Sequence, residues 1–258
     1  MGYTKLKKSH LIKHKIHKAT SNEYLRILIL RTVGNFLILS SLFMIGKTFY
    51  KPVTEEAKYF VNSLVKKKFV LVLPGKKENV DEQIQKIALQ ESKAQKGFLT
   101  KTFNIKQVEA LVPEDPNFSI VVPKIGANAR ILPNTDASDE NIYLDALNKG
   151  VAHTLGTAFP GEGGHIFLFA HSTDYFWRVG TYNAIFYLLN KLEPKDEVNL
   201  FYKGQRYVYR VIDKRVVDPS EVTYLTRKTN KEFLTLQTCW PPGTTLKRLL
   251  VFAVRVAE

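Results

Sequence analysis

The stretch LTLQTCWPPGTTLKRLLVF, residues 234–252, contains two apolar runs separated by a Pro-Pro-Gly turn. In the first run apolar and polar side chains alternate up to Cys239, which is the pattern of a half-buried β-strand. Arg248 opens the second run, nine positions after Cys239. Two strands joined by a turn form a hairpin, so the guanidinium of Arg248 can return beside the sulfur of Cys239.

Similar short runs, rich in Val, Ile, Phe and Tyr, precede this stretch from Phe118 onward. Six such runs are FSIVVPKI, HIFLFAH, EVNLFY, QRYVYRVIDKRVV, FLTLQTC and RLLVFAVRV, and KGQ (203–205) joins two of them as a tight hairpin. Six or more strands in about 140 residues predict a closed β-barrel or a β-sandwich. Helices are few: DENIYLDALNKG (139–150) and TYNAIFYLLNKL (181–192) have apolar residues at helical spacing.

The charge of the chain is concentrated before this β-rich region. The formal net charge is +14, of which residues 1–31 carry +7 and residues 47–107 carry +7, while residues 108–258 hold 17 basic and 17 acidic side chains. A nucleic-acid-binding surface would concentrate basic residues on the folded domain. We therefore expect no nucleic-acid partner.

An apolar segment near the N-terminus predicts one transmembrane helix. The segment YLRILILRTVGNFLILSSLFMIGKTFY, residues 24–50, is long enough to span a bilayer if Arg26 and Arg31 reach one interface. A buried core helix is the alternative, because the uncharged run from Thr32 to Gly46 is short. A cleaved signal peptide is disfavoured, because no small-x-small cleavage site follows.

Charge next to this segment predicts its orientation. Eight basic residues before Thr32 outnumber Lys47 and Lys51 on the other side, so the N-terminus is expected in the cytoplasm and the rest outside the cell. The expected division is a basic cytoplasmic head (1–23), a transmembrane signal anchor (24–50), a lysine-rich stalk or linker (51–116) and a globular domain (117–258). FVLVL, residues 69–73, could instead add a strand to that domain.

Cys239 is the only cysteine, which excludes an internal disulfide and supplies too few thiolates for a structural zinc site. A lone cysteine is commonly a small buried hydrophobe. The alternative is a nucleophile, which needs a base or a cation beside it. His171 follows the apolar run HIFLFA and therefore also lies at a strand end, and Arg248 supplies a permanent positive charge.

These residues resemble the signature of the sortases, the membrane-bound cysteine transpeptidases of bacterial surfaces. TLQTC, a Pro-containing turn and KRLLVFA match the Thr-Leu-x-Thr-Cys sequence and downstream Arg of that family. FSIVVPKIGANARI is similar to its first strands, ALNKGVAHTLGTAFPGEGGHIFLFAHS to the block that leads to its histidine, and LEPKDEVNLFY to the strand before the catalytic hairpin. The resemblance covers about residues 118–258 and is nearest to classes D and E.

The resemblance implies an eight-stranded sortase-type β-barrel with short helices, and a role for each reactive residue. Cys239 would be the nucleophile, His171 the proton-transfer partner and Arg248 the stabiliser of the oxyanion. Thr238 matches a position that lines the sortase site. Trp177 and Trp240 are further candidates for substrate contact, although aromatic residues near position 177 could instead pack on the barrel.

The implied activity is cleavage of a C-terminal Leu-Pro-x-Thr-type sorting signal after Thr. An acyl-thioester on Cys239 would then pass to an amine of a cell-wall precursor or a pilin lysine, without a metal or cofactor. The partners would be surface proteins with that motif, the amine acceptor and the membrane. The alternatives are a hydrolytic cysteine peptidase and a non-catalytic, membrane-anchored binding barrel in which Cys239 is buried and inert.

Overall fold

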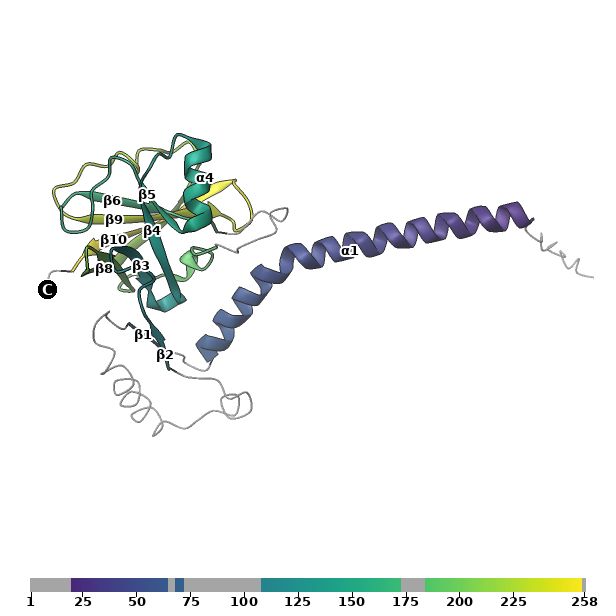
Figure 1. Ribbon diagram of the computed structural model, residues 1–258, viewed down its shortest axis with the longest axis horizontal. Coiled ribbons are helices and arrows are strands. Elements are labelled where there is room, and N and C mark those ends of the chain that lie inside the picture. Colours follow the sequence, from purple (N-terminus) through teal and green to yellow (C-terminus); the bar gives the residue numbers. More distant parts are fainter. Residues whose placement is uncertain (1–19, 65–67, 72–107, 173–183, 257–258) are drawn as a thin grey trace, which may run out of the picture. The chain divides into compact units, whose positions relative to one another are not determined.

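The computed structural model describes residues 20–64, 68–71, 108–172 and 184–256. The chain divides into two compact units, residues 1–50 and 51–258, and helix α1 (Ser21–Leu64) runs through both of them (Figure 1). The basic head up to residue 19 and Trp177 lie outside the described residues.

Helix α1 begins three residues before the expected span. The backbone N–H of Thr20 donates to the Glu23 carboxylate at 2.8 Å, and the Tyr24 N–H donates to the Thr20 carbonyl at 3.0 Å. This is half of a capping box, which satisfies a backbone donor at the helix start. From Ser21 to Lys47 the helix is long and apolar enough to cross a membrane, and the structure buries none of it. The segment is thus consistent with a membrane anchor.

The second unit is built on a closed eight-stranded barrel. Its strands neighbour one another in the order β10, β8, β7, β3, β4, β5, β6, β9. Their bounds are β3 Phe118–Val122, β4 Ala127–Thr135, β5 Val151–Thr154, β6 His165–Phe169, β7 Glu197–Tyr202, β8 Gln205–Val217, β9 Phe233–Trp240 and β10 Lys247–Arg255. Two neighbouring pairs, β4 with β5 and β6 with β9, are parallel. The expectation of an eight-stranded barrel is therefore confirmed.

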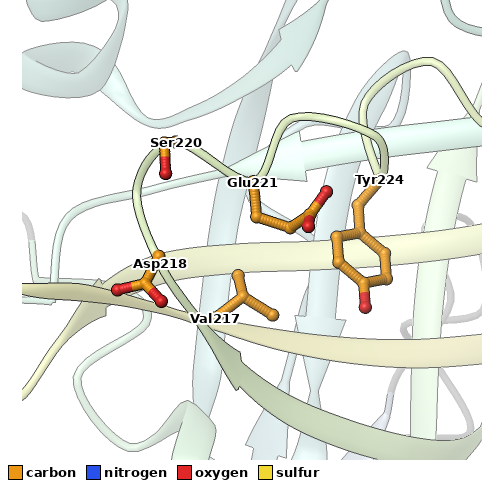
Figure 2. A pocket seen from close by; sticks show the side chains of 5 residues that line it. All are labelled: Val217, Asp218, Ser220, Glu221 and Tyr224. Carbon is orange, nitrogen blue, oxygen red and sulfur yellow. The ribbon is translucent and has the colours of Figure 1, made fainter.

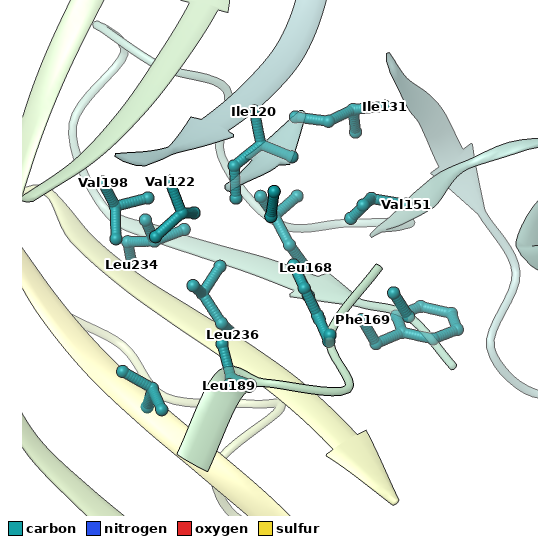
Figure 3. Close-up of a cluster of buried hydrophobic side chains, with 14 of the residues drawn as sticks. Ile120, Val122, Ile131, Val151, Leu168, Phe169, Leu189, Val198, Leu234 and Leu236 are labelled. Carbon is teal, nitrogen blue, oxygen red and sulfur yellow. The ribbon is translucent and has the colours of Figure 1, made fainter. Parts of the chain in front are cut away.

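The barrel interior is filled with aliphatic side chains from facing strands (Figure 3). Ile120, Leu168, Leu200, Leu234 and Leu236 each have 0% of their surface exposed. In β9 the two leucines are separated by one residue, because successive side chains of a strand point to opposite faces. Burial of this core stabilises the scaffold that holds the strand ends in place.

Two local predictions hold and one is wrong. The KGQ hairpin is a two-residue turn in which Lys203 and Gly204 have φ of 50° and 78°, as tight hairpins require. Helix α4 (Glu140–Lys149) forms as expected, and the Asp139 carboxylate caps its first backbone N–H groups. In the other predicted helix, residues 181–192, the described part is a turn followed by a single 3-10 turn, η3 (Leu189–Lys191).

The reason for this difference lies in how tightly the segment packs against the barrel. Phe186, Leu189 and Leu192 are each 0% exposed. The Phe186 N–H donates to the His171 carbonyl at 3.3 Å, which ties the segment to the residues that follow β6. Burial and this tertiary bond override the local helical spacing.

The described part of FVLVL, residues 69–71, lies in a strand, although not one of the barrel. Strand β1 (Lys68–Leu71) pairs in parallel with β2 (Val108–Leu111) in a separate two-stranded sheet. Phe69 and Leu71 pack against Leu111 and the barrel residues Val121 and Phe201. Part of the expected stalk is thus packed on the outside of the barrel.

Candidate active site

Cys239 lies near the end of β9, directly opposite the arginine of the next strand. Strands β9 and β10 are antiparallel, and their register pairs Cys239 with Arg248. Side chains that lie directly opposite in a sheet project to the same face and are about 5 Å apart at Cβ. The hairpin expected from the sequence is therefore present, and it brings thiol and guanidinium together.

The histidine is level with the cysteine on the other side. Strand β6 runs parallel to β9, and their register ends with Phe169 paired to Gln237. The pairing continues one step further, since the Ala170 N–H donates to the Gln237 carbonyl at 3.1 Å. Two residues beyond that last pair are His171 and Cys239, so the predicted histidine and cysteine lie at the ends of neighbouring strands.

The Thr238 side chain helps to hold the end of β6 in register with β9. Its hydroxyl donates to the Ala170 carbonyl at 2.9 Å and the residue is 3% exposed. Thr238 shares a face of β9 with Leu234 and Leu236, whereas Cys239 points to the opposite face. The structure therefore shows Thr238 holding the end of β6, and direct contact with a substrate stays a prediction.

The environment of Cys239 favours the neutral thiol. Burial raises the pKa of the half-buried Cys239 above its usual value, and the positive charge of Arg248 opposes this shift without cancelling it. A thiolate is the nucleophilic form of cysteine. A proton acceptor beside the sulfur is consequently needed for attack at neutral pH, and the nearest residue in register that can accept a proton is His171.

Arg248 is held by the turn that precedes it. Its Nη1 donates to the carbonyls of Thr245 and Lys247, both at 3.1 Å. The four-residue turn 241–244 needs a left-handed backbone at its third position, where Gly243 has φ of 82°. The Pro-Pro-Gly sequence thus shapes the loop that anchors the guanidinium, whose positive charge acts on the Cys239 thiol.

Trp240 and Trp177 are the two other residues for which the sequence suggested substrate contact. Trp240 is half-buried, packs against the hydrophobic core and adjoins Cys239 at the end of β9. A side chain there can form a wall of the site, and substrate contact by Trp240 stays a prediction. Trp177 lies outside the described residues.

A cavity of about 340 Å³ lies at the end of β8 (Figure 2). Val217, one of its lining residues, pairs in register with Arg248. The other lining residues are Asp218, Ser220, Glu221 and Tyr224. The cavity therefore adjoins the row formed by Arg248, Cys239 and His171. Sequence reasoning missed it, because the segment after β8 has no periodic pattern and its Asp-Pro-Ser sequence indicates only a turn.

The other histidines of the barrel are engaged elsewhere. The His153 Nδ1 accepts from the Asn134 backbone N–H at 3.2 Å, and Nε2 lies 3.1 Å from the Ala158 carbonyl. The His165 Nε2 lies 2.8 Å from the Thr235 hydroxyl. Burial lowers the pKa of both, that of His165 to about 4. Both side chains thus serve the packing of the barrel as neutral rings.

No group of three or more His, Cys, Asp or Glu side chains suited to hold a metal ion occurs among the described residues. The functional groups that lie together at this end of the barrel are a thiol, an imidazole and a guanidinium. This set can form a covalent thioester, transfer a proton and stabilise an oxyanion.

Several known sortases are similar to this chain. Sortase D of Bacillus subtilis (strain 168) is 29% identical to this chain over 176 residues, which cover 66% of this chain and 80% of that protein. Sortase C-1 of Actinomyces oris, a crystal structure, is 34% identical with a TM-score of 0.46, covering 56% of this chain and 76% of that one. A pilus-related sortase C of Group B Streptococcus is 28% identical with a TM-score of 0.45, covering 55% and 68%.

The family model of the sortase domain matches residues 120–256, which is more than half of the chain. The match includes β4 to β10 and nearly all of β3, and Cys239, His171 and Arg248 lie within it. The chain therefore belongs to the sortase family of cysteine transpeptidases.

Proposed function

We propose that this sortase cleaves a C-terminal Leu-Pro-x-Thr-type sorting signal after Thr and transfers the acyl group to an amine. The observation that carries the proposal is the placement of Cys239 between Arg248, its register partner on β10, and His171, level with it beyond β6. Covalent catalysis of acyl transfer needs a nucleophile, a proton carrier and an oxyanion stabiliser at one carbonyl. Arg248 on β10, Cys239 on β9 and His171 just after β6 lie in one row across three neighbouring strands, and we assign these three roles to them.

In the first half of the reaction the Cys239 sulfur attacks the carbonyl carbon of Thr. The thiol proton passes to His171, which then protonates the leaving amine as the C–N bond breaks. The product is an acyl-thioester on Cys239. In the second half an amine attacks that thioester and gives a proton to His171, the new amide forms as the C–S bond breaks, and the leaving thiolate takes that proton from His171. One difficult amide exchange is thus divided into two easier steps.

Arg248 stabilises the negative oxygen of both tetrahedral intermediates. Its guanidinium is always protonated and presents several N–H donors in a fixed plane. Because two of the Arg248 contacts are to backbone carbonyls of its own turn, the group is held in place before the charge develops. A donor oriented in advance in this way needs no reorganisation during the reaction.

The cavity beside Arg248 is the candidate site for the residues of the sorting signal. Its lining mixes the Tyr224 ring and Val217 with the polar Asp218, Ser220 and Glu221. Trp240 and Trp177 are the further candidates for substrate contact. The acceptor is an amine of a cell-wall precursor or a pilin lysine, and the similarity to Sortase D accords with a class D or E enzyme.

The positive charge before Thr32 supports a cytoplasmic N-terminus, with the barrel outside the cell. Protease added to intact spheroplasts should then digest the chain beyond Lys51 and spare the N-terminal head. Digestion of the head with protection of the barrel would show the opposite orientation.

The activity is tested with the full chain in detergent, a Leu-Pro-x-Thr-Gly peptide and excess amine. We expect an amide-joined product, and hydroxylamine should release a Thr hydroxamate from the thioester. The His171→Ala variant should lose turnover while its thermal unfolding stays that of the wild type. Near-normal activity of this variant would remove His171 from the mechanism.

The two alternative functions give different results in the same assay. A hydrolytic cysteine peptidase would cut the peptide without incorporating the amine at any amine concentration. A binding barrel would leave the peptide intact, and its Cys239 would resist alkylating reagents. Either result would overturn the transpeptidase proposal.

A further inference from the structure

The last three turns of α1 carry an apolar stripe that the barrel does not cover. Val53, Ala57, Phe60 and Leu64 follow one another at intervals of four, three and four residues, so they lie on one face of the helix. Val53, Phe60 and Leu64 are 61%, 62% and 54% exposed, and Val61, beside them, is 38% exposed. These five residues, here called the juxtamembrane stripe, form a continuous exposed apolar surface.

The opposite face of these turns contacts the barrel unit through polar groups. Glu56 makes an ion pair with Lys191 at 3.2 Å, and the Lys191 ammonium lies 5.4 Å from the centre of the Tyr59 ring. Tyr59 and Asn62 also line a cavity of about 430 Å³ together with residues of β1 and of the barrel. The face toward the barrel is thus the polar one.

This arrangement is the reverse of the usual one. A helix on the surface of a water-soluble domain normally buries its apolar stripe and exposes its charges. Here Glu56 and Tyr59 contact the domain and the apolar stripe is exposed. The stripe is therefore suited to an apolar environment that is not part of the barrel.

The apolar span at the start of the same helix would bring a membrane next to the stripe. The juxtamembrane stripe begins six residues after Lys47, the end of the apolar span, within the same helix. Pro52 stands between the two segments, and because proline has no N–H and clashes with the preceding turn, a helix can bend there. Lysines flank the stripe on both sides, at 47, 51 and 66–68.

We propose that residues 53–64 form an interfacial helix that lies in the membrane surface next to the span. The juxtamembrane stripe would enter the boundary between headgroups and acyl chains, the flanking lysines would meet lipid phosphates, and the polar face would hold the barrel. Helices with an apolar face, basic residues and a polar face bind bilayers in this way. The proposal does not depend on the chemistry assigned to Cys239.

A lipid surface fits the stripe better than a second copy of the chain does. A stable protein interface buries about 800 Å² on each partner, and five half-exposed side chains, one of them alanine, provide too little area. Contact with lipid needs no minimum area, because the span already keeps the stripe at the membrane at high effective concentration. The proposal therefore commits to the bilayer as the occupant.

The test uses the single cysteine of the chain. In a Cys239→Ala background, a nitroxide label is attached to the full-length chain at Phe60→Cys and the protein is reconstituted in anionic liposomes. Collision rates of the label with oxygen and with a water-soluble nickel chelate are then compared. The matched control is Leu155→Cys in the barrel, because Leu155 is 56% exposed, close to the 62% of Phe60.

We expect the label at 60 to collide often with oxygen and rarely with nickel, and the label at 155 to show the reverse. Labels at 53, 57 and 64 should give the same result as the label at 60, whereas a label at the exposed Lys58 should be intermediate. The ratio of oxygen to nickel collision rates should thus vary with the helical period. Equal nickel access at 60 and 155 would overturn the proposal. Spin–spin broadening at 60 that persists when protein is diluted in excess lipid would identify a second copy instead, and would also overturn it.

A second measurement follows the position of the barrel. In the Cys239→Ala background, a donor dye on Leu246→Cys, a position that is 68% exposed, should transfer energy efficiently to acceptor lipids, and less efficiently when Phe60→Asp and Leu64→Asp are added. Both substituted side chains are exposed, so the fold is expected to persist and thermal unfolding checks it. Leu155→Asp should leave the transfer unchanged. Equal transfer in all three proteins would show that the stripe does not hold the barrel near the bilayer.

Discussion

The two ends of strands β9 and β10 differ in what their polar groups contact. At one end lie Cys239 and Arg248. At the other, the Glu232 carboxylate just before β9 accepts hydrogen bonds from the Tyr209 hydroxyl, from the Gly161 N–H at 3.2 Å and from Arg255 at 3.2 Å. The Glu232 side chain is only 7% exposed. One end is thus a closed network, whereas the other carries two of the residues that we propose to act on the substrate.

The difference shows how a small barrel separates stability from reactivity. Buried polar groups stabilise a fold only when they are fully paired, and the Glu232 network joins β8, β10 and the loop before β6 in this way. An active site needs polar groups that bind the transition state more strongly than they bind one another. Full pairing of its polar groups within the protein is therefore not its purpose. Substitutions at the two ends should therefore separate into effects on activity and effects on folding.

The largest effect is expected from Cys239→Ala. Without the sulfur no thioester can form, so amine incorporation should fall by about 10⁴-fold or more. The residue is half-buried and the change is small, so the unfolding free energy should stay within about 0.5 kcal/mol of the wild type. Product formation is measured by mass spectrometry and stability by urea unfolding. Activity within tenfold of the wild type would show that another residue is the nucleophile.

The second largest effect is expected from Glu232→Ala, at the other end of the two strands, and it is a loss of stability. Glu232→Ala removes the shared acceptor of three donors, and we expect a loss of about 2–4 kcal/mol in unfolding free energy. Arg255 can turn to water, which keeps the loss below that of a fully buried pair. The activity of the folded fraction should be normal. Glu193→Ala, at an exposed site, is the control and should change stability little; equal stability of both variants would contradict a structural network.

A third prediction makes the same substitution at both ends of β10. Arg248→Lys keeps the charge but loses the planar donors, so kcat should fall about 10²-fold with little change in KM. Arg255→Lys should leave kcat unchanged and lower stability slightly, because Arg255 pairs with Glu232. Steady-state kinetics of both variants measure the contrast. A change in KM alone for Arg248→Lys would make Arg248 a substrate-docking residue.

The smallest expected effect is a pH dependence of stability from His165. Burial, with a smaller contribution from the charge of Arg227, lowers the pKa of His165 from 6.5 to about 4. Between these values the unfolded chain binds more protons than the folded one, so acidification favours unfolding. From pH 7.5 to 5.5 the contribution should be a loss of about 1.4 kcal/mol.

Denaturant unfolding of the wild type and of His165→Gln at both pH values isolates this contribution. The pKa of His153 is also lowered, so only the difference between the two proteins reports on His165. The variant should lose less stability on acidification than the wild type. A parallel loss in both proteins would show that His165 does not hold a lowered pKa in the folded state.

Much of the barrel could be predicted from the chain because most of its strands are short runs of β-branched and aromatic side chains separated by turn residues. The two strands that the pattern did not show are β4 and β5. In β4 the first two buried positions are Ala127 and Ala129, which contribute little hydrophobic contrast, and β5 has only four residues. Periodicity is a weak signal where the inward side chains are small or the strand is short.

The Glu232 network could not be predicted either. Its members come from β8, β10, the loop around Gly161 and the residue before β9. No spacing rule joins positions that far apart in the chain, and a glutamate among Lys and Asn residues indicates only a solvated loop. Its burial results from closure of the barrel.

By itself the sequence determined the local elements: an apolar span, strands as short apolar runs between turn residues, a Pro-Pro-Gly turn, and the pairing of Cys239 with Arg248 that a hairpin imposes. Only the tertiary structure decided that His171 comes level with Cys239, because this depends on parallel pairing of β6 with β9, strands that are not joined by a hairpin. Backbone hydrogen bonds form that pairing, and they are the same for every residue type. The choice of partner strand is made by burying both apolar faces in one core, which is a property of the whole barrel.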